Sequence, residues 1–274
     1  MLKRTMSMTA AGAALVVAAV AGCGSNAQPI QINLAASEVL TQAAQKTAEV
    51  TSYTVDAVVN LTHPHEGSGT VQGRMLYQSK PQLAADLTLD TVNFGQRSVP
   101  GGVRAVLQGD TVYVKVEALR ELVGATKPWI KVPLKEADGG SGEVNELLSR
   151  IQQFDLGNVT QLVTASQDVQ AAGNETVNGE DTTHYTGTFP VDAAVQQLPA
   201  DEQEQAREHL AELKDIKFDI WVAADGLPRK LAMNGSKDGA SLDATLFFKG
   251  FNEPVTIQTP PADQIGELPE NTTN

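Results

Sequence analysis

Cysteine and aromatic residues are scarce in this chain. Cys23 is the single cysteine among 274 residues, so the chain cannot form an internal disulfide and must be stabilised by an ordinary core. Phe, Trp and Tyr together make up 5% of the residues, and valine, leucine and alanine are plentiful. An interior built mainly from aliphatic side chains leaves two alternatives, a loosely filled core or an enclosed space.

Basic residues are also few relative to acidic ones. The chain has 20 Lys and Arg against 33 Asp and Glu, a net charge of −13. Removal of Lys3 and Arg4 with an N-terminal signal would leave 18 basic residues and a net charge of −15. Such a charge repels nucleic acid and anionic lipid headgroups, so we expect no nucleic-acid partner and no basic membrane-binding patch.

Known catalytic motifs are absent as well. The chain has no Gly-x-Ser-x-Gly, Ser-x-x-Lys or His-Glu-x-x-His motif and no phosphate-binding glycine loop. His63, His65 and Glu66 could bind a metal weakly, but a zinc site normally needs three or four ligands, which favours an exposed hairpin loop. His184 lies in an expected strand, where packing against neighbours is favoured over catalysis. We therefore predict no catalytic residue, no metal site and no cofactor, and keep a hydrolase only as the weakest alternative.

No apolar run is long enough to cross a bilayer. The longest N-terminal run, residues 10–20, would make a helix of roughly 16 Å, about half the thickness of a bilayer core. Lys3 and Arg4 precede this run, and Val20, Ala21 and Gly22 lead directly into Cys23, which together form a bacterial lipobox. The alternative is a single transmembrane anchor with an incidental cysteine. The pattern favours a signal peptide over residues 1–22, a diacylglyceryl group on Cys23, a tether over residues 23–33, and export with lipid anchoring to the outer face of the cell membrane.

The rest of the chain alternates in ways that predict an α+β fold. Period-two patterns bounded by turn residues predict strands, and i, i+3, i+4 patterns predict helices. No βαβ rhythm is present, so we expect a strongly curved antiparallel sheet with helices covering its concave face. The domain is expected over residues 34–262, followed by a polar tail over 263–274. The expected strands are 53–61, 69–77, 82–92, 103–107, 111–116, 129–132, 169–177, 182–189, 215–223, 227–234 and 240–248, and the expected helices are 33–50, 143–155, 158–165 and 191–213.

The apolar positions of these elements are the candidate site residues. They either form a solid core, which close packing favours in most folds, or line a hydrophobic ligand cavity. The candidates are Leu83, Leu87, Leu89, Val112, Val114, Leu147, Leu148, Ile151, Phe218, Ile220, Leu246 and Phe248.

The chain resembles a known group, the actinobacterial lipoproteins of the LppX/LprAFG type and, more broadly, the LolA/LolB-like carriers. The resemblance rests on the lipobox, the order of elements and three local phrases, at residues 179–188, 221–230 and 251–261. It implies a half-open barrel whose helices enclose a hydrophobic cavity for acyl chains, and a role in carrying lipids or lipoglycans between membrane layers.

Two functions of different class follow from this resemblance. The first is a membrane-anchored lipoprotein that binds an acyl lipid or lipoglycan and carries or presents it in the cell envelope, with an envelope transporter of unknown identity as a candidate partner. The second is a lipid-sensing or protein-interaction module that regulates an envelope complex without transport.

Overall fold

A computed structural model describes residues 35–64, 67–95, 97–116, 125–133, 156–189, 191–196, 203–204 and 216–267. These residues belong to one compact unit, Leu34–Asn274. The expected signal peptide, Cys23 and the tether lie outside the described residues. So does the expected helix over 143–155, which contains the candidates Leu147, Leu148 and Ile151.

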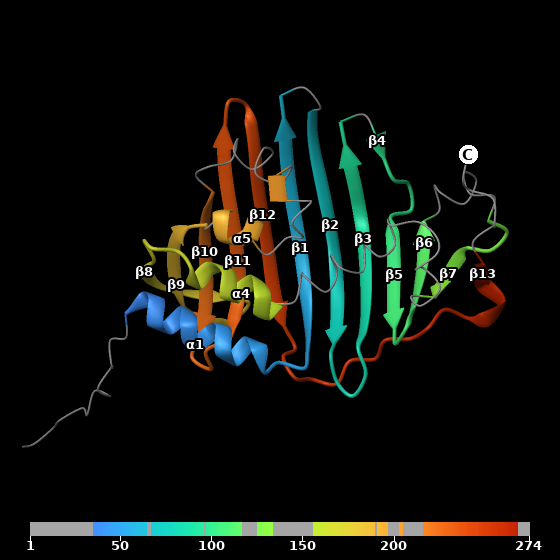
Figure 1. Ribbon diagram of the computed structural model, residues 1–274, viewed down its shortest axis with the longest axis horizontal. Helices are drawn as coiled ribbons and strands as arrows, with labels where there is room; N and C mark the ends of the chain where they lie inside the picture. The colour runs from blue at the N-terminus through green and yellow to red at the C-terminus, as the bar shows by residue number, and fades with distance from the viewer. Residues whose placement is uncertain are drawn as a thin grey trace, which may run out of the picture. The chain divides into compact units, whose positions relative to one another are not determined.

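The described strands form one sheet, shown face-on in Figure 1. Its strand order is β13-β7-β6-β5-β3-β2-β1-β12-β11-β10-β9-β8, and the short β4 pairs with β3 beside this path. All pairs are antiparallel except β13 with β7. The strands are β1 (Ser52–His63), β2 (Gly67–Gln78), β3 (Ala84–Phe94), β4 (Arg97–Ser98), β5 (Val103–Gln108), β6 (Thr111–Val116), β7 (Trp129–Pro133), β8 (Gln170–Val177), β9 (Glu180–Thr188), β10 (Lys217–Ala223), β11 (Pro228–Lys237), β12 (Ala240–Lys249) and β13 (Ile265–Glu267).

Two hairpin series make up this order. Strands β1 to β7 follow one another on one side, β8 to β12 follow one another on the other, and the pairing of β12 with β1 joins the two series. The turns carry residues that tolerate positive φ: Asn178 and Gly179 between β8 and β9 have φ of 51° and 86°. Two successive positive φ values are those of the tight hairpin turn that Asn-Gly favours, so the expected β8–β9 pair is confirmed.

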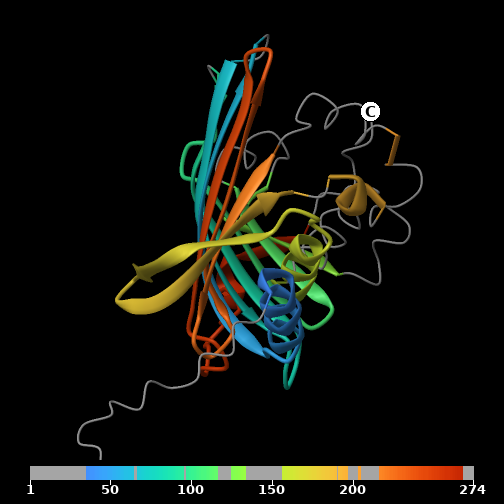
Figure 2. The same ribbon diagram turned by 90° about the vertical axis from the view of Figure 1, so that its left-hand side faces the viewer.

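Helices α1 (Ala36–Ala48) and α4 (Leu156–Thr164) lie on one face of the curved sheet, as the two views show (Figures 1 and 2). A third helix, α5, spans Val191–Gln196. Leu40 and Ala43 of α1 and Val163 of α4 are fully buried in one cluster with residues of β1, β9, β10, β11 and β12. The predicted fold class, an unclosed antiparallel sheet with helices on its concave face, is confirmed.

The end of the chain departs from the expected tail. Residues 262–264 form a 3₁₀ turn, and Ile265–Glu267 pair in parallel with Trp129–Lys131 of β7. The described structure thus continues to residue 267, beyond the expected boundary at 262. A strand of three residues is too short to show hydrophobic alternation in the sequence. Main-chain hydrogen bonds to the neighbouring strand hold it in place.

Candidate functional site

The concave face of the sheet carries aligned rows of apolar residues. Successive side chains of a strand point to opposite faces, so residues paired across strands share one face. Tyr53 and Val55 point to the same face as the helices, since both belong to the core cluster with Leu40. We call this the inner face. Its first full row contains Phe248, Val55, Met75, Leu87, Ala105 and Val114.

Three further rows continue along the same face toward the upper ends of β1, β2 and β3 in Figure 1, away from α1 and α4. We call these three rows the open inner face. Of their residues, Ala244 and Gly69 are buried and the others are half-buried or exposed. The rows are Leu246, Ala57, Gly73, Leu89 and Val103; then Ala244, Val59, Val71 and Val92; and last Leu242, Leu61, Gly69 and Phe94.

Exposure rises along these rows from the core to the rim. Val55 and Phe248 of the first row are 7% and 3% exposed, whereas Leu61 and Phe94 of the last row are 37% and 36% exposed. Burial of apolar surface contributes about 25 cal/mol per Å². The apolar surface of the open inner face is still in contact with water, so an apolar ligand that covers it gains this free energy. The core residues are already buried and offer no such gain.

Two glycines of β2 keep this surface smooth. A Cβ atom added to Gly69 would lie 2.4 Å from Cδ2 of Phe94, and one added to Gly73 would lie 2.7 Å from Cδ2 of Leu89. The larger side chains of β3 thus lie against the bare backbone of β2. The described rows therefore present aliphatic and aromatic side chains at close spacing.

The structure divides the nine described candidates into two groups. Phe218, Ile220 and Phe248 fill the packed core beneath α1 and α4, and Val112 packs with Ala85 and Leu107 in a second cluster, with Leu83 and Val114 against it. Phe218, Ile220, Phe248 and Val112 are buried core residues in the described structure. Leu87, Leu89, Val114 and Leu246 face inward and stay half-buried.

Several residues of the open inner face were missed by the sequence reasoning. Val59, Val71 and Leu242 lie in strands that the alternation did predict, so extending the alternation would have found them. Phe94 lies two residues beyond the predicted end of its strand, and a bulge between Gln72 and Gly73 shifts the register so that Phe94 shares a face with Leu89. The bulge carries no clear mark in the sequence.

His184 lies on the opposite, outer face, packed among its neighbours. Its ring stacks on Trp221 with centroids 4.3 Å apart, and its Nδ1 and Nε2 lie 3.1 Å and 2.8 Å from carboxylate oxygens of Glu175 and Asp219. The prediction that His184 packs against its neighbours is confirmed. His63 ends β1, while His65 and His209 lie outside the described residues. Within the described ranges, no cluster of three or more His, Cys, Asp or Glu could hold a metal ion.

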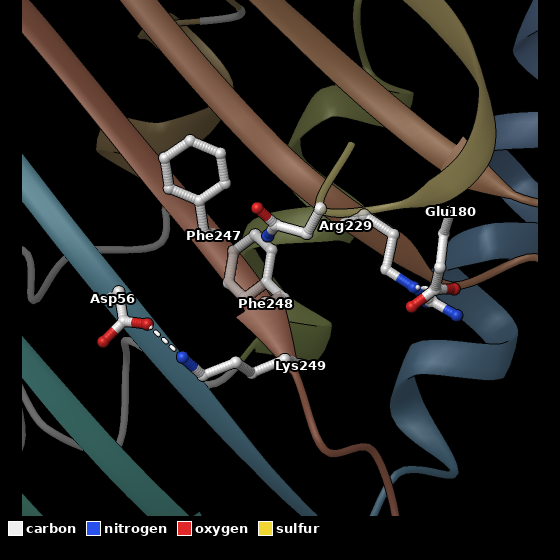
Figure 3. A pocket seen from close by; sticks show the side chains of 7 residues that line it. Asp56, Glu180, Arg229, Phe247, Phe248 and Lys249 are labelled. Atoms are coloured by element: carbon white, nitrogen blue, oxygen red, sulfur yellow. Dashed lines mark hydrogen bonds and ion pairs between the residues drawn. The ribbon is translucent and has the colours of Figure 1, made fainter. Parts of the chain in front are cut away.

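A pocket of about 470 Å³ is lined by Asp56, Phe247, Phe248, Lys249, Arg229 and the β8–β9 turn (Figure 3). Phe248 belongs to the packed first row, and none of the lining residues belongs to the open inner face. Asp56 pairs with Phe247 across β1 and β12, on the face opposite to Val55. Asp56 binds both Arg74 and Lys249. Burial alone would raise the pKa of Asp56, but these two hydrogen-bonded cations lower it below its ordinary value. The carboxylate therefore stays charged at neutral pH.

The helices that the structure describes include none that is both long and apolar enough to cross a membrane.

The described residues define the fold as a curved, unclosed antiparallel sheet with helices on its concave face. The LppX_LprAFG lipoprotein family model matches residues 144–257. The resemblance to the LppX/LprAFG lipoproteins expected from the sequence is thereby confirmed.

Known proteins of related sequence and structure are also found. A 31.2 kDa protein of Streptomyces griseus, encoded between rplA and rplJ, is 29% identical over 179 residues, which cover 62% of this chain. The match spans 58% of that relative, little more than half its length. The crystal structure of Mycobacterium tuberculosis LppX is similar with 21% identity and a TM-score of 0.47, covering 81% of this chain and 98% of LppX. The crystal structure of Mycobacterium bovis LprF is similar with 16% identity and a TM-score of 0.48, covering 82% of this chain and 96% of LprF.

Proposed function

We propose that this protein is an exported lipoprotein that binds an acyl lipid or lipoglycan on its open inner face and carries or presents it in the cell envelope. The observation that carries the proposal is the run of apolar rows that ends in the exposed Leu61 and Phe94. Acyl chains bind such a surface because each CH₂ group removed from water contributes about 0.8 kcal/mol. The match to a lipoprotein family supports the same proposal.

The proposed ligand needs no chemical step. Aliphatic side chains offer neither a nucleophile nor a general base, so the open inner face binds and releases its ligand without making or breaking a bond. Leu89 and Leu246 are the predicted cavity residues that lie on the open inner face, and Leu87 borders it in the first row. The proposal adds Val59, Val71 and Phe94 to them.

The proposed anchor is a diacylglyceryl group on Cys23, attached to the outer face of the cell membrane. Two acyl chains hold a protein stably at a membrane, whereas one gives only marginal binding. Metabolic labelling with a radioactive fatty acid tests the anchor. We expect label in the wild-type chain and none in Cys23→Ala, and label retained in Cys23→Ala would contradict the assignment.

A matched pair of variants tests lipid binding. Leu89→Gln places an amide on the open inner face, while Thr88→Gln places the same amide on the outer face of the same strand; both positions are half-buried. We expect native mass spectrometry and solvent extraction to find acyl lipid with the wild type and with Thr88→Gln, and much less with Leu89→Gln. A wild-type protein that purifies empty and takes up no acyl lipid would refute lipid carriage and favour the regulatory alternative.

A further inference from the structure

The polar pocket on the outer face is separate from the proposed lipid site. Its residues Asp56, Phe247 and Lys249 alternate along β1 and β12 with Val55, Leu246 and Phe248, which point to the inner face. The two sites therefore lie on opposite sides of the same sheet. What the pocket binds does not depend on the proposed function.

The charges around this pocket are balanced. The Arg229 guanidinium donates from Nε to Glu180 at 2.8 Å and from NH2 to Asp225 at 2.7 Å. Arg74 and Lys249 both bind Asp56. In these ion pairs three cations meet three carboxylates, while a fourth cation, Lys230, lies over the rings of Trp221 and Phe247. An anionic or cationic ligand that used the paired groups would have to displace an existing ion pair. This balance favours an uncharged ligand.

Hydrogen-bonding capacity nevertheless remains at the mouth of the pocket. The side chains of Lys249 and Glu180 are 52% and 55% exposed, and each has further donor or acceptor sites beyond its ion pair. Asn178 adds an exposed residue with an amide that can both donate and accept. Hydrogen bonds to charged groups are about twice as strong as those between neutral groups. The mouth can therefore bind a ligand that both donates and accepts, as a hydroxyl group does.

One aromatic side chain supplies an apolar surface beside these polar groups. Phe247 is half-buried and lines the pocket, and the Lys230 ammonium lies 5.8 Å from its ring centroid. The ring is held at a defined position in β12 by its register with Asp56 and Lys230. An aromatic ring next to charge-assisted hydrogen-bonding groups suits a ligand with one C–H face and hydroxyl groups at its edge.

The pocket is also held in shape before any ligand binds. Arg229 is 11% exposed and connects the β8–β9 hairpin through Glu180 to the turn before β11 through Asp225. Its guanidinium also lies 5.2 Å from the centroid of the Phe251 ring. A preorganised site loses less conformational freedom on binding. The volume of about 470 Å³ is within the usual range for small-molecule pockets, about 300–1,000 Å³.

The geometry points to a binding site for a neutral sugar, with a pyranose ring placed over Phe247 and its hydroxyl groups bound by Lys249, Glu180 and Asn178. A free oligosaccharide and the sugar headgroup of a glycolipid both present this chemistry. The site recognises the sugar in either case.

Saturation-transfer NMR on the full chain tests this site, with the protein kept in an amine-oxide detergent that contains no sugar. One arm uses methyl glucoside and maltose as free sugars, and a second uses galactosyl diacylglycerol. We expect saturation of the sugar C–H protons in at least one arm, and the arm that responds identifies the source. Phe247→Ala should weaken sugar binding by at least about tenfold, or about 1.4 kcal/mol. Tyr113→Ala, which removes another half-buried aromatic ring from the outer face but outside both the pocket and the open inner face, should leave it unchanged.

A second variant tests the same site in case Phe247→Ala does not fold. Asn178→Gly removes the amide while glycine readily adopts the positive φ of 51° found there, so the turn is kept. It should weaken the sugar signals while circular dichroism stays that of the wild type. The proposal is wrong if folded wild-type protein shows no sugar saturation in either arm. It is equally wrong if phosphoethanolamine, a zwitterion, binds and the sugars do not.

Discussion

At the scale of single residues, Asp168 connects the end of α4 to β9 through an unusually complete set of hydrogen bonds. It accepts from the Thr188 backbone N–H at 2.8 Å, from the Thr188 hydroxyl at 2.7 Å and from the Ser166 hydroxyl at 2.8 Å. These hydrogen bonds lower the pKa of Asp168 from 3.8 to about 2, and the bond from the Thr188 backbone N–H has the largest effect. The folded state therefore binds a proton at Asp168 less readily than the unfolded state.

The sign of the resulting pH dependence follows directly. A carboxylate whose pKa is depressed by folding stabilises the protein above its unfolded pKa, and that contribution is lost as the pH falls from about 4 through about 2. Asp168→Asn removes the charge and should lower the free energy of unfolding at pH 5, with the difference from wild type shrinking toward pH 2. Urea unfolding at a series of pH values measures this. A constant difference across that range would contradict the assignment, and Asp243→Asn, at an exposed position of β12, controls for the loss of one negative charge.

At the scale of elements, the close approach of β2 and β3 depends on glycine. A Cβ at Gly73 would lie 2.4 Å from the Thr88 backbone oxygen, which can move only if the strand moves. A Cβ at Gly69 meets the Phe94 ring at 2.4 Å, and that exposed side chain can turn away. Gly73→Ala should therefore lower the free energy of unfolding by about 1–3 kcal/mol, and Gly69→Ala by less. Chemical denaturation of both variants provides the comparison, and equal losses would show that the backbone contact is not what matters.

The same elements show how far the sequence alone could reach. Strands such as β3 and β12 were predictable because leucine and alanine alternate with aspartate and threonine at period two. The separation of the core from the open inner face could not be predicted. Phe248 and Leu246 follow the same alternation, yet Phe248 is a buried member of the core cluster and Leu246 is only half-buried at its border. The polar pocket was beyond reach for another reason. Asp56, Glu180 and Arg229 are far apart in sequence and meet only through the strand order.

At the scale of the whole molecule, a sheet that does not close leaves two edges. β8 forms one edge, and a bulge between Ala171 and Gly173 interrupts its regular pairing. β13 forms the other, where it pairs with β7. Regular unpaired edges promote association between chains, and bulges or short covering strands limit it. We infer that β13 protects the edge of β7.

Two truncations distinguish this protective role from a general effect of shortening the chain. A chain ending at Pro261 lacks β13 and leaves the hydrogen-bonding groups of Trp129–Lys131 available to other molecules, so it should self-associate at concentrations where the full chain does not. A chain ending at Glu267 keeps β13 and should behave like the full chain. Light scattering coupled to size-exclusion chromatography measures the mass of each. Because β13 lies at the edge and not on the open inner face, a shorter chain that stays monomeric should still bind acyl lipid. Equal masses for the two truncated chains would show that β13 does not prevent association at this edge.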